Sequence, residues 1–144
     1  MKLQSISVED IQYVAHSLAK ELMSWDEPIP AFETRFPNKL EACVALPFQT
    51  WDKRLLYQGL MPKAAVLFYS IIKNHPFQNG NKRIAVTSML TFLYKNKRWL
   101  SADNQRLYNL AKWVAESDPL FKDETVHAIE KFLKIHLTHP GKTH

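Results

Sequence analysis

Two long apolar stretches with helical spacing flank one short polar run, and this arrangement constrains the fold more than any other feature. In the first stretch, which begins near Pro62, apolar residues recur every three or four positions up to Asn74. In the second, they recur from Ile84 to about Asn96. Both apolar stripes are wide, so we expect two central helices. The run 75–83 then forms the loop between them.

The rest of the chain also favours helices over strands. Only three glycines occur among 144 residues, and strand-like alternation is rare. Ser7 is a good N-cap for a first helix. The residues expected to be buried on that helix are Ile11, Val14, Ala15, Leu18 and Leu22. Further helices are expected over 38–45, 104–117 and 123–136, and prolines 28, 30 and 37 predict an irregular segment over 25–37.

These patterns predict an all-α fold with a single compact helical domain over residues 1–138. Residues 139–144 are expected to be a disordered tail. The lone cysteine, Cys43, has no partner for an internal disulfide and is expected to be a buried structural thiol. Histidines 16, 127, 136, 139 and 144 are expected at surface or tail positions.

Charge and hydropathy limit the classes of partner and location. The net charge of +5 favours an anionic partner, but the basic residues are scattered, which disfavours nucleic acid as that partner. No apolar run approaches the length of a membrane-spanning helix. The apolar stretch at the start of the chain is also too short for a secretory signal. We therefore expect a soluble, cytoplasmic protein with no membrane partner.

The polar run His75-Pro-Phe-Gln-Asn-Gly-Asn-Lys-Arg83 combines the parts of an anion site with a base. A helix that begins near Asn81 directs free N–H groups and its positive dipole end at the loop. Gly80 would let an anion approach the backbone, and Lys82 and Arg83 add cations. His75 can accept a proton near neutral pH. The same residues also fit a solvated basic pair and an ordinary loop histidine.

This run resembles the signature of the Fic/Doc family, His-x-Phe-x-(Asp/Glu)-(Ala/Gly)-Asn-(Gly/Lys)-Arg, and it matches eight of its nine positions. The resemblance implies an all-helical transferase in which His75 deprotonates a hydroxyl of a target protein and Phe77 anchors the loop. It implies that Gly80, Asn81, Lys82 and Arg83 bind the phosphates of ATP. It also implies an extended flap, here Pro47, Phe48, Gln49 and Thr50, that pairs with a segment of the target.

Lys82 places the chain closest to the Doc-like toxins, in which lysine replaces glycine at this position. Resemblance to that branch implies transfer of the ATP γ-phosphate to a serine or threonine of a translation factor similar to elongation factor Tu. It also implies an antitoxin that inhibits in trans. The absence of a second arginine, with Val86 three residues after Arg83, agrees with this branch. The alternative is a Fic-type transferase of AMP or another nucleoside monophosphate.

Asn79 is the one departure from the signature, because it occupies the acidic position that the family uses for Mg²⁺. A neutral amide oxygen binds Mg²⁺ more weakly than a carboxylate does. Asn79 therefore predicts a weakened metal site in a natural or altered enzyme, or a catalytically silent binding module that keeps the fold.

Overall fold

A computed structural model of the chain describes residues 2–138, so the expected tail over 139–144 lies outside the described residues. One helical segment opens the chain and runs through α1 (Val8–Asp10), the π-helical η1 (Ile11–Ala15) and α2 (His16–Ala19). The other helices are α3 (Pro37–Ala45), α4 (Leu60–Asn74), α5 (Asn81–Lys95), α6 (Asn104–Glu116) and α7 (Lys122–His136). Short 3-10 turns are η2 (Phe32–Thr34), η3 (Leu46–Phe48) and η4 (Pro119–Phe121).

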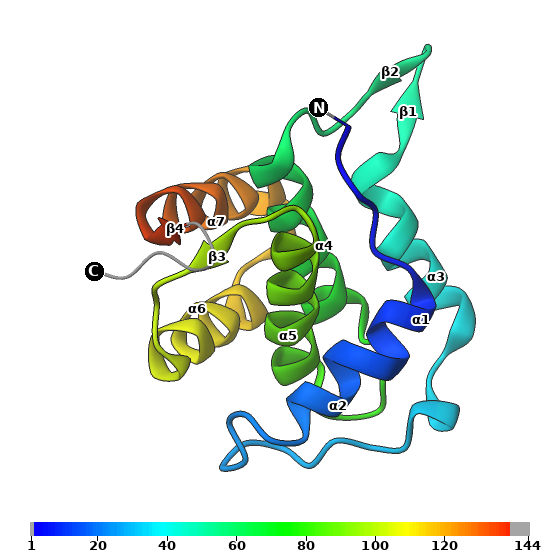
Figure 1. Cartoon of the computed structure of the whole chain (residues 1–144), viewed down its shortest axis with the longest axis vertical. Helices are drawn as coiled ribbons and strands as arrows, with labels where there is room; N and C mark the ends of the chain where they lie inside the picture. The colour runs from blue at the N-terminus through cyan, green and yellow to red at the C-terminus, as the bar shows by residue number, and fades with distance from the viewer. Residues whose placement is uncertain (1, 139–144) are drawn as a thin grey trace.

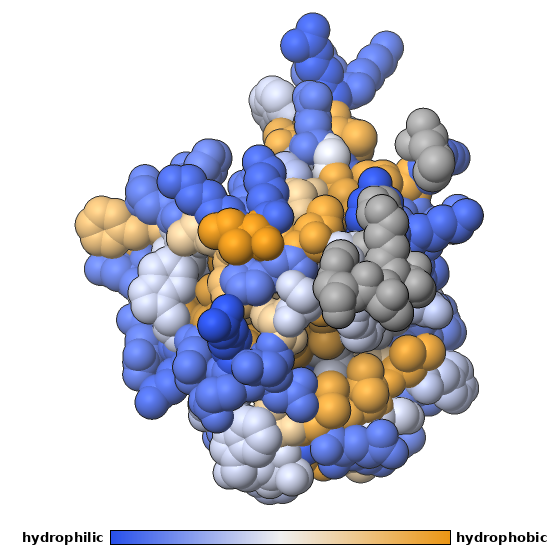
Figure 2. Space-filling model, turned by 60° about the vertical axis from the view of Figure 1, so that its left-hand side comes forward, coloured by the Kyte–Doolittle hydropathy of each residue, from blue (hydrophilic) through white to orange (hydrophobic). Residues whose placement is uncertain are grey.

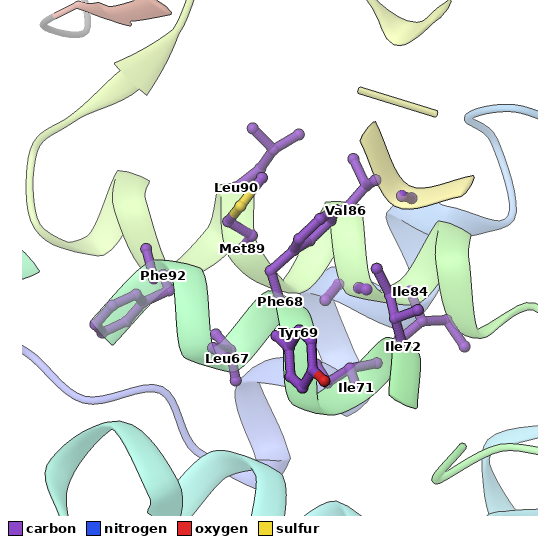
Figure 3. Packing of buried hydrophobic residues seen from close by; sticks show 14 of the residues in the cluster. Leu67, Phe68, Tyr69, Ile71, Ile72, Ile84, Val86, Met89, Leu90 and Phe92 are labelled. Carbon is purple, nitrogen blue, oxygen red and sulfur yellow. The ribbon is translucent and has the colours of Figure 1, made fainter. Parts of the chain in front are cut away.

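Helices α4 and α5 form the centre of the molecule and pack against each other along their length. In Figure 1, α6 and α7 lie on one side of this pair, and α1, α2 and α3 lie on the other. The buried side chains of the two central helices interdigitate, with Phe68 of α4 among the residues drawn in Figure 3. The predicted all-α fold with two central helices is therefore confirmed, and Cys43 is buried in the same core.

The first helix buries part of the predicted set, since Ile11 and Ala15 are fully buried as expected. Ser7 is its N-cap, as expected, and forms a capping box with Asp10. Val14, expected in the core, is 49% exposed, whereas the buried positions are Ile11, Ala15, His16 and Ala19. The cause is the π-helical turn, whose wider spacing shifts the buried face by about one residue. The α-helical period alone could not reveal this shift.

Two short strand pairs were not predicted. Strands β1 (Thr50–Trp51) and β2 (Arg54–Leu55) form an antiparallel hairpin in which Thr50 faces Leu55. This hairpin projects from the helical body at the top of Figure 1. Strands β3 (Trp99–Leu100) and β4 (Leu137–Thr138) pair antiparallel and tie the start of α6 to the end of α7. Each strand has only two residues, too few for a visible alternation.

The surface is largely hydrophilic, with separate apolar patches in the view of Figure 2. Leu120, for example, is 86% exposed. Among residues 2–138, no helix is both long enough and apolar enough to cross a membrane.

Substitution of the central core should be costly. Phe68 is fully buried between α4 and its neighbours, so Phe68→Ala should lower the free energy of unfolding by about 3–5 kcal/mol, measured by urea denaturation. The control is Leu120→Ala, which should change it by less than about 0.5 kcal/mol because that side chain is already in water. Equal effects of the two substitutions would contradict this description of the core.

Candidate functional site

The loop between α4 and α5 is bounded by two residues in the left-handed conformation. His75, the C-cap of α4, has φ +51°, and Gly80, the N-cap of α5, has φ +73°. These two residues bound the six-residue segment 75–80 that joins the helices. No side chain caps the first turn of α5, so its backbone N–H groups are left without a capping partner. The start of α5 therefore retains the anion-attracting character predicted from the sequence.

The structure divides the run 75–83 into an exposed group and a buried group. His75, Gln78 and Asn79 are exposed, and Lys82 is half-buried. The buried residues are Pro76, Phe77, Gly80, Asn81 and Arg83. Side chains available to a ligand from solvent therefore come from the exposed group.

Asn81 ties the loop together and orients the histidine. Its side-chain oxygen accepts a hydrogen bond from the Phe77 N–H at 3.0 Å, and its amide nitrogen donates to the Phe77 carbonyl at 2.8 Å. These two bonds fix the orientation of the amide, so its Nδ2 faces His75 Nδ1 at 3.3 Å. Asn81 therefore holds the His75 ring in place through its Nδ1 side.

Phe77 has the placement expected of a loop anchor. It is 1% exposed and packs against Phe32 and His16, with ring centroids 5.9 Å away in both cases. The expectation that His16 lies on the surface is wrong, because it is only 3% exposed and its Nε2 lies 2.8 Å from the Pro30 carbonyl. Its burial follows from the π-helical turn, which rotates position 16 inward.

Arg83 does not point at the predicted phosphate site. Its side chain is 3% exposed and donates to three backbone carbonyls, those of Ala19 at 2.5 Å, Glu27 at 2.7 Å and Leu22 at 3.0 Å. Desolvation lowers the pKa of Arg83, and the nearby Asp26 carboxylate partly opposes this effect. The guanidinium therefore holds the segment after α2 against the first turn of α5, and it is not open to a ligand in this arrangement.

The segment from Glu27 to Pro30, here called the strap, also covers Gly80 and approaches Lys82. A Cβ atom at position 80 would lie 2.6 Å from Ile29 Cδ1 and 3.3 Å from the Pro28 carbonyl oxygen, so glycine suits both the left-handed φ of +73° and the close approach of the strap. The Lys82 ammonium lies 3.9 Å from the Glu27 carboxylate. Such a half-exposed pair is weak, and an anion at the loop can compete for Lys82. The three prolines predicted that this segment is irregular. They did not predict that it covers the start of α5.

The predicted flap, residues 47–50, is buried in its first half and exposed in its second. Pro47 is buried and Phe48 half-buried, and both lie in the 3-10 turn η3, which corrects the expectation that the flap is extended from Pro47 onward. Gln49 and Thr50 are exposed. A cavity of about 600 Å³ lies between the end of α3, this segment and Asn74, the residue before His75. The available edge is therefore Gln49, Thr50 and the strands that follow.

A larger cavity of about 750 Å³ lies near the other end of α5, between Lys2–Gln4 and Lys95–Arg98. It contains no residue of the loop, and we do not assign the chemistry of the loop to it. Among the described residues, no group of three or more His, Cys, Asp and Glu side chains could hold a metal ion. Any Mg²⁺ at the loop would therefore depend on the Asn79 side-chain oxygen together with oxygens of a bound phosphate, as Mg²⁺ sites often do.

A measurement of stability distinguishes the two possible roles of Arg83, a structural contact with backbone carbonyls and a phosphate ligand. Arg83→Lys should lower the free energy of unfolding by about 2–4 kcal/mol, because a lysine cannot bond three carbonyls with a planar fork. Urea denaturation measures this change, and Arg54→Lys on the exposed hairpin is the matched control, expected to change little. If Arg83→Lys were as stable as the parent chain but lost affinity for ATP, the side chain would be a phosphate ligand.

Comparisons with known proteins connect the chain to one family. The model of the Fic/DOC family matches residues 5–93, which include the first helix, the hairpin, α4, the loop and most of α5. A curated relative, Toxin Doc of Mycolicibacterium smegmatis, is 42% identical over 64 residues, which are 44% of this chain and 49% of that protein. The match thus spans about half of the relative's length. No solved structure gives a significant match. With more than half of its residues matched, the chain belongs to the Fic/DOC family.

Proposed function

We propose that this protein is a Doc-like toxin that transfers the γ-phosphate of ATP to a serine or threonine hydroxyl of another protein. The observation that carries the proposal is the meeting of His75 with the uncapped start of α5 at one exposed loop. A base and an anion site at one loop are what transfer of a phosphoryl group to a hydroxyl requires.

The proposed reaction assigns each exposed group a task. The N–H groups at the start of α5 and the Lys82 ammonium bind phosphate oxygens, and binding draws Lys82 away from Glu27. His75 takes the proton of the acceptor hydroxyl while the oxygen of that hydroxyl bonds to the γ-phosphorus. The bond between that phosphorus and the β-phosphate oxygen breaks, and ADP leaves. Asn81 keeps the histidine next to the phosphates through its contact at Nδ1.

Mg²⁺ is part of the proposal as the ion that neutralises phosphate charge when bound. Asn79 is exposed on the loop, and its amide oxygen is a hard donor suited to Mg²⁺. The fit is weaker than a carboxylate would give. We therefore expect Mg²⁺ dependence together with low turnover.

The nature of Lys82 and Val86 favours phosphate transfer over nucleotide transfer. Lys82 fills space at the loop that glycine would leave open and adds a positive charge. Position 86, three residues after Arg83, is a fully buried valine, so the chain has no second cation at that position. The enzymatic alternative is the Fic-type transfer of AMP or another nucleoside monophosphate. The alternative from a different class is a silent binding module, which Asn79 favours.

The proposed acceptor is a translation factor similar to elongation factor Tu, and the proposed role is that of a cytoplasmic toxin controlled by an antitoxin. Support for the toxin role comes from the similarity to a protein named Toxin Doc. The exposed edge at Gln49 and Thr50, beside the cavity that reaches Asn74, would receive an extended segment of the acceptor.

The position of the radiolabel in ATP distinguishes phosphate transfer, nucleotide transfer and the binding module. The purified chain is incubated with Mg²⁺, a bacterial lysate and ATP labelled at the α- or the γ-phosphate, and the proteins are separated on a gel. Label from the γ position alone is expected on one protein, and His75→Ala should reduce it by about 10²- to 10⁴-fold. His127→Ala, which alters another exposed histidine, is the control. Label from the α position would establish nucleotide transfer, and no label from either would favour the binding module.

Restoring the acidic residue should raise activity. Asn79→Asp is expected to increase the initial rate of label transfer about ten-fold or more, because a carboxylate holds Mg²⁺ more tightly than an amide does. The gain should be largest at low Mg²⁺. Gln78→Glu adds the same charge one residue away and should not reproduce it. Equal rates for Asn79→Asp and the parent chain across a Mg²⁺ titration would show that position 79 does not bind the metal.

A further inference from the structure

Lys63 is a buried lysine that the proposed reaction does not use. It lies in the first turns of α4 and is only 1% exposed. Its burial lowers the pKa of the ammonium. The positive end of the helix dipole lies close by, which also disfavours a cation. An apolar residue would fit this core position more easily, so the retention of an amine requires a reason.

The contacts of Lys63 join the two ends of the hairpin. Its Nζ donates to the carbonyl of Tyr57, which follows β2, and lies 5.1 Å above the ring centroid of Phe48, which precedes β1. These are the interactions of its ammonium within the described chain. Both are directed at segments that begin and end the hairpin, and no carboxylate takes part in either.

The same contacts connect the hairpin to α4 and α5, the two helices that flank the loop. Phe48 packs edge to face against Phe92 of α5, with ring centroids 6.2 Å apart. Lys63 belongs to α4, which ends at Asn74 and leads directly into His75. The Gln49 carbonyl accepts from the Leu56 N–H at 3.0 Å, so the two stems are also bonded to each other. Lys63 therefore holds both stems of the hairpin against the start of α4.

We propose that Lys63 is a positioning residue that fixes the base of the hairpin against α4 and thereby sets affinity for the protein acceptor, not for ATP. The part of this inference that concerns the acceptor rests on the proposed function. The part that concerns the hairpin does not. Only a long side chain with a donor at its tip can reach the Tyr57 carbonyl and the Phe48 ring from within α4.

This role predicts a separation between stability and hairpin order. In Lys63→Met the buried charge is removed and the apolar contacts are kept, so the melting temperature should stay close to that of the parent chain. Residues 50–57 should exchange their amide hydrogens about ten-fold faster, because the stems lose their common anchor. Lys63→Arg, which retains a donor and a cation over Phe48, should restore part of the protection.

The matched control is Lys73→Met on the same helix. Lys73 also donates to backbone carbonyls, those of Ala115 and Ser117 at the end of α6. Its substitution should speed exchange near residues 115–118 and leave the hairpin unchanged. Hydrogen exchange followed by mass spectrometry measures both segments in one experiment, without any ligand.

The acceptor part is tested by label transfer from γ-labelled ATP into a dilution series of one bacterial lysate. Lys63→Met should raise the lysate concentration at half-saturation about five-fold or more and leave the half-saturating ATP concentration unchanged. Equal shifts in both would overturn the acceptor assignment, since a general loss of structure affects both. Absence of label with the parent chain would count against the proposed function and leave the exchange result intact.

Unchanged exchange of residues 50–57 in a folded Lys63→Met chain would overturn the positioning role. If that chain does not fold, Phe48→Leu replaces it. This substitution keeps an apolar side chain but removes the ring that Lys63 faces, and it should also speed exchange of the hairpin. Protection equal to that of the parent chain would then reject the proposal.

Discussion

Three backbone carbonyls around the Arg83 guanidinium hold the start of α5 to the segment that follows α2, and the loop geometry depends on this contact. The carbonyls come from residues separated in sequence from Arg83 by more than fifty positions. A planar group with several donors is suited to such a cluster, because each N–H points at a different carbonyl. The strap is thereby fixed over Gly80, where a side chain would crowd Ile29 and strain the left-handed backbone.

The loop therefore has two functions on two sides. Its buried side, with Phe77, Asn81 and Arg83, sets the backbone shape through packing and hydrogen bonds. Its exposed side presents His75, Asn79 and Lys82 at the uncapped end of α5. Preorganisation of this kind would lower the cost of holding the groups of the proposed reaction in place. In a family signature written as letters, both kinds of residue look equally important, although only one kind is open to a ligand.

The hairpin depends on the same two central helices as the loop does. Lys63 and Phe92 hold its base from α4 and α5, and the cavity beside it reaches Asn74. The loop and the hairpin thus share one rigid support, although they are separated in the sequence.

The sequence by itself determined the helical class, the two central helices, the N-cap at Ser7 and the position of the loop, because these follow from local periodicity and capping chemistry. It also determined the family, through the run from His75 to Arg83. Only the tertiary structure decided that Arg83 and Gly80 face the strap, that His16 is buried by a π-helical turn, and that Lys63 anchors a hairpin. These features depend on residues distant in the chain, and the direction of a side chain among such neighbours is not encoded in its local pattern.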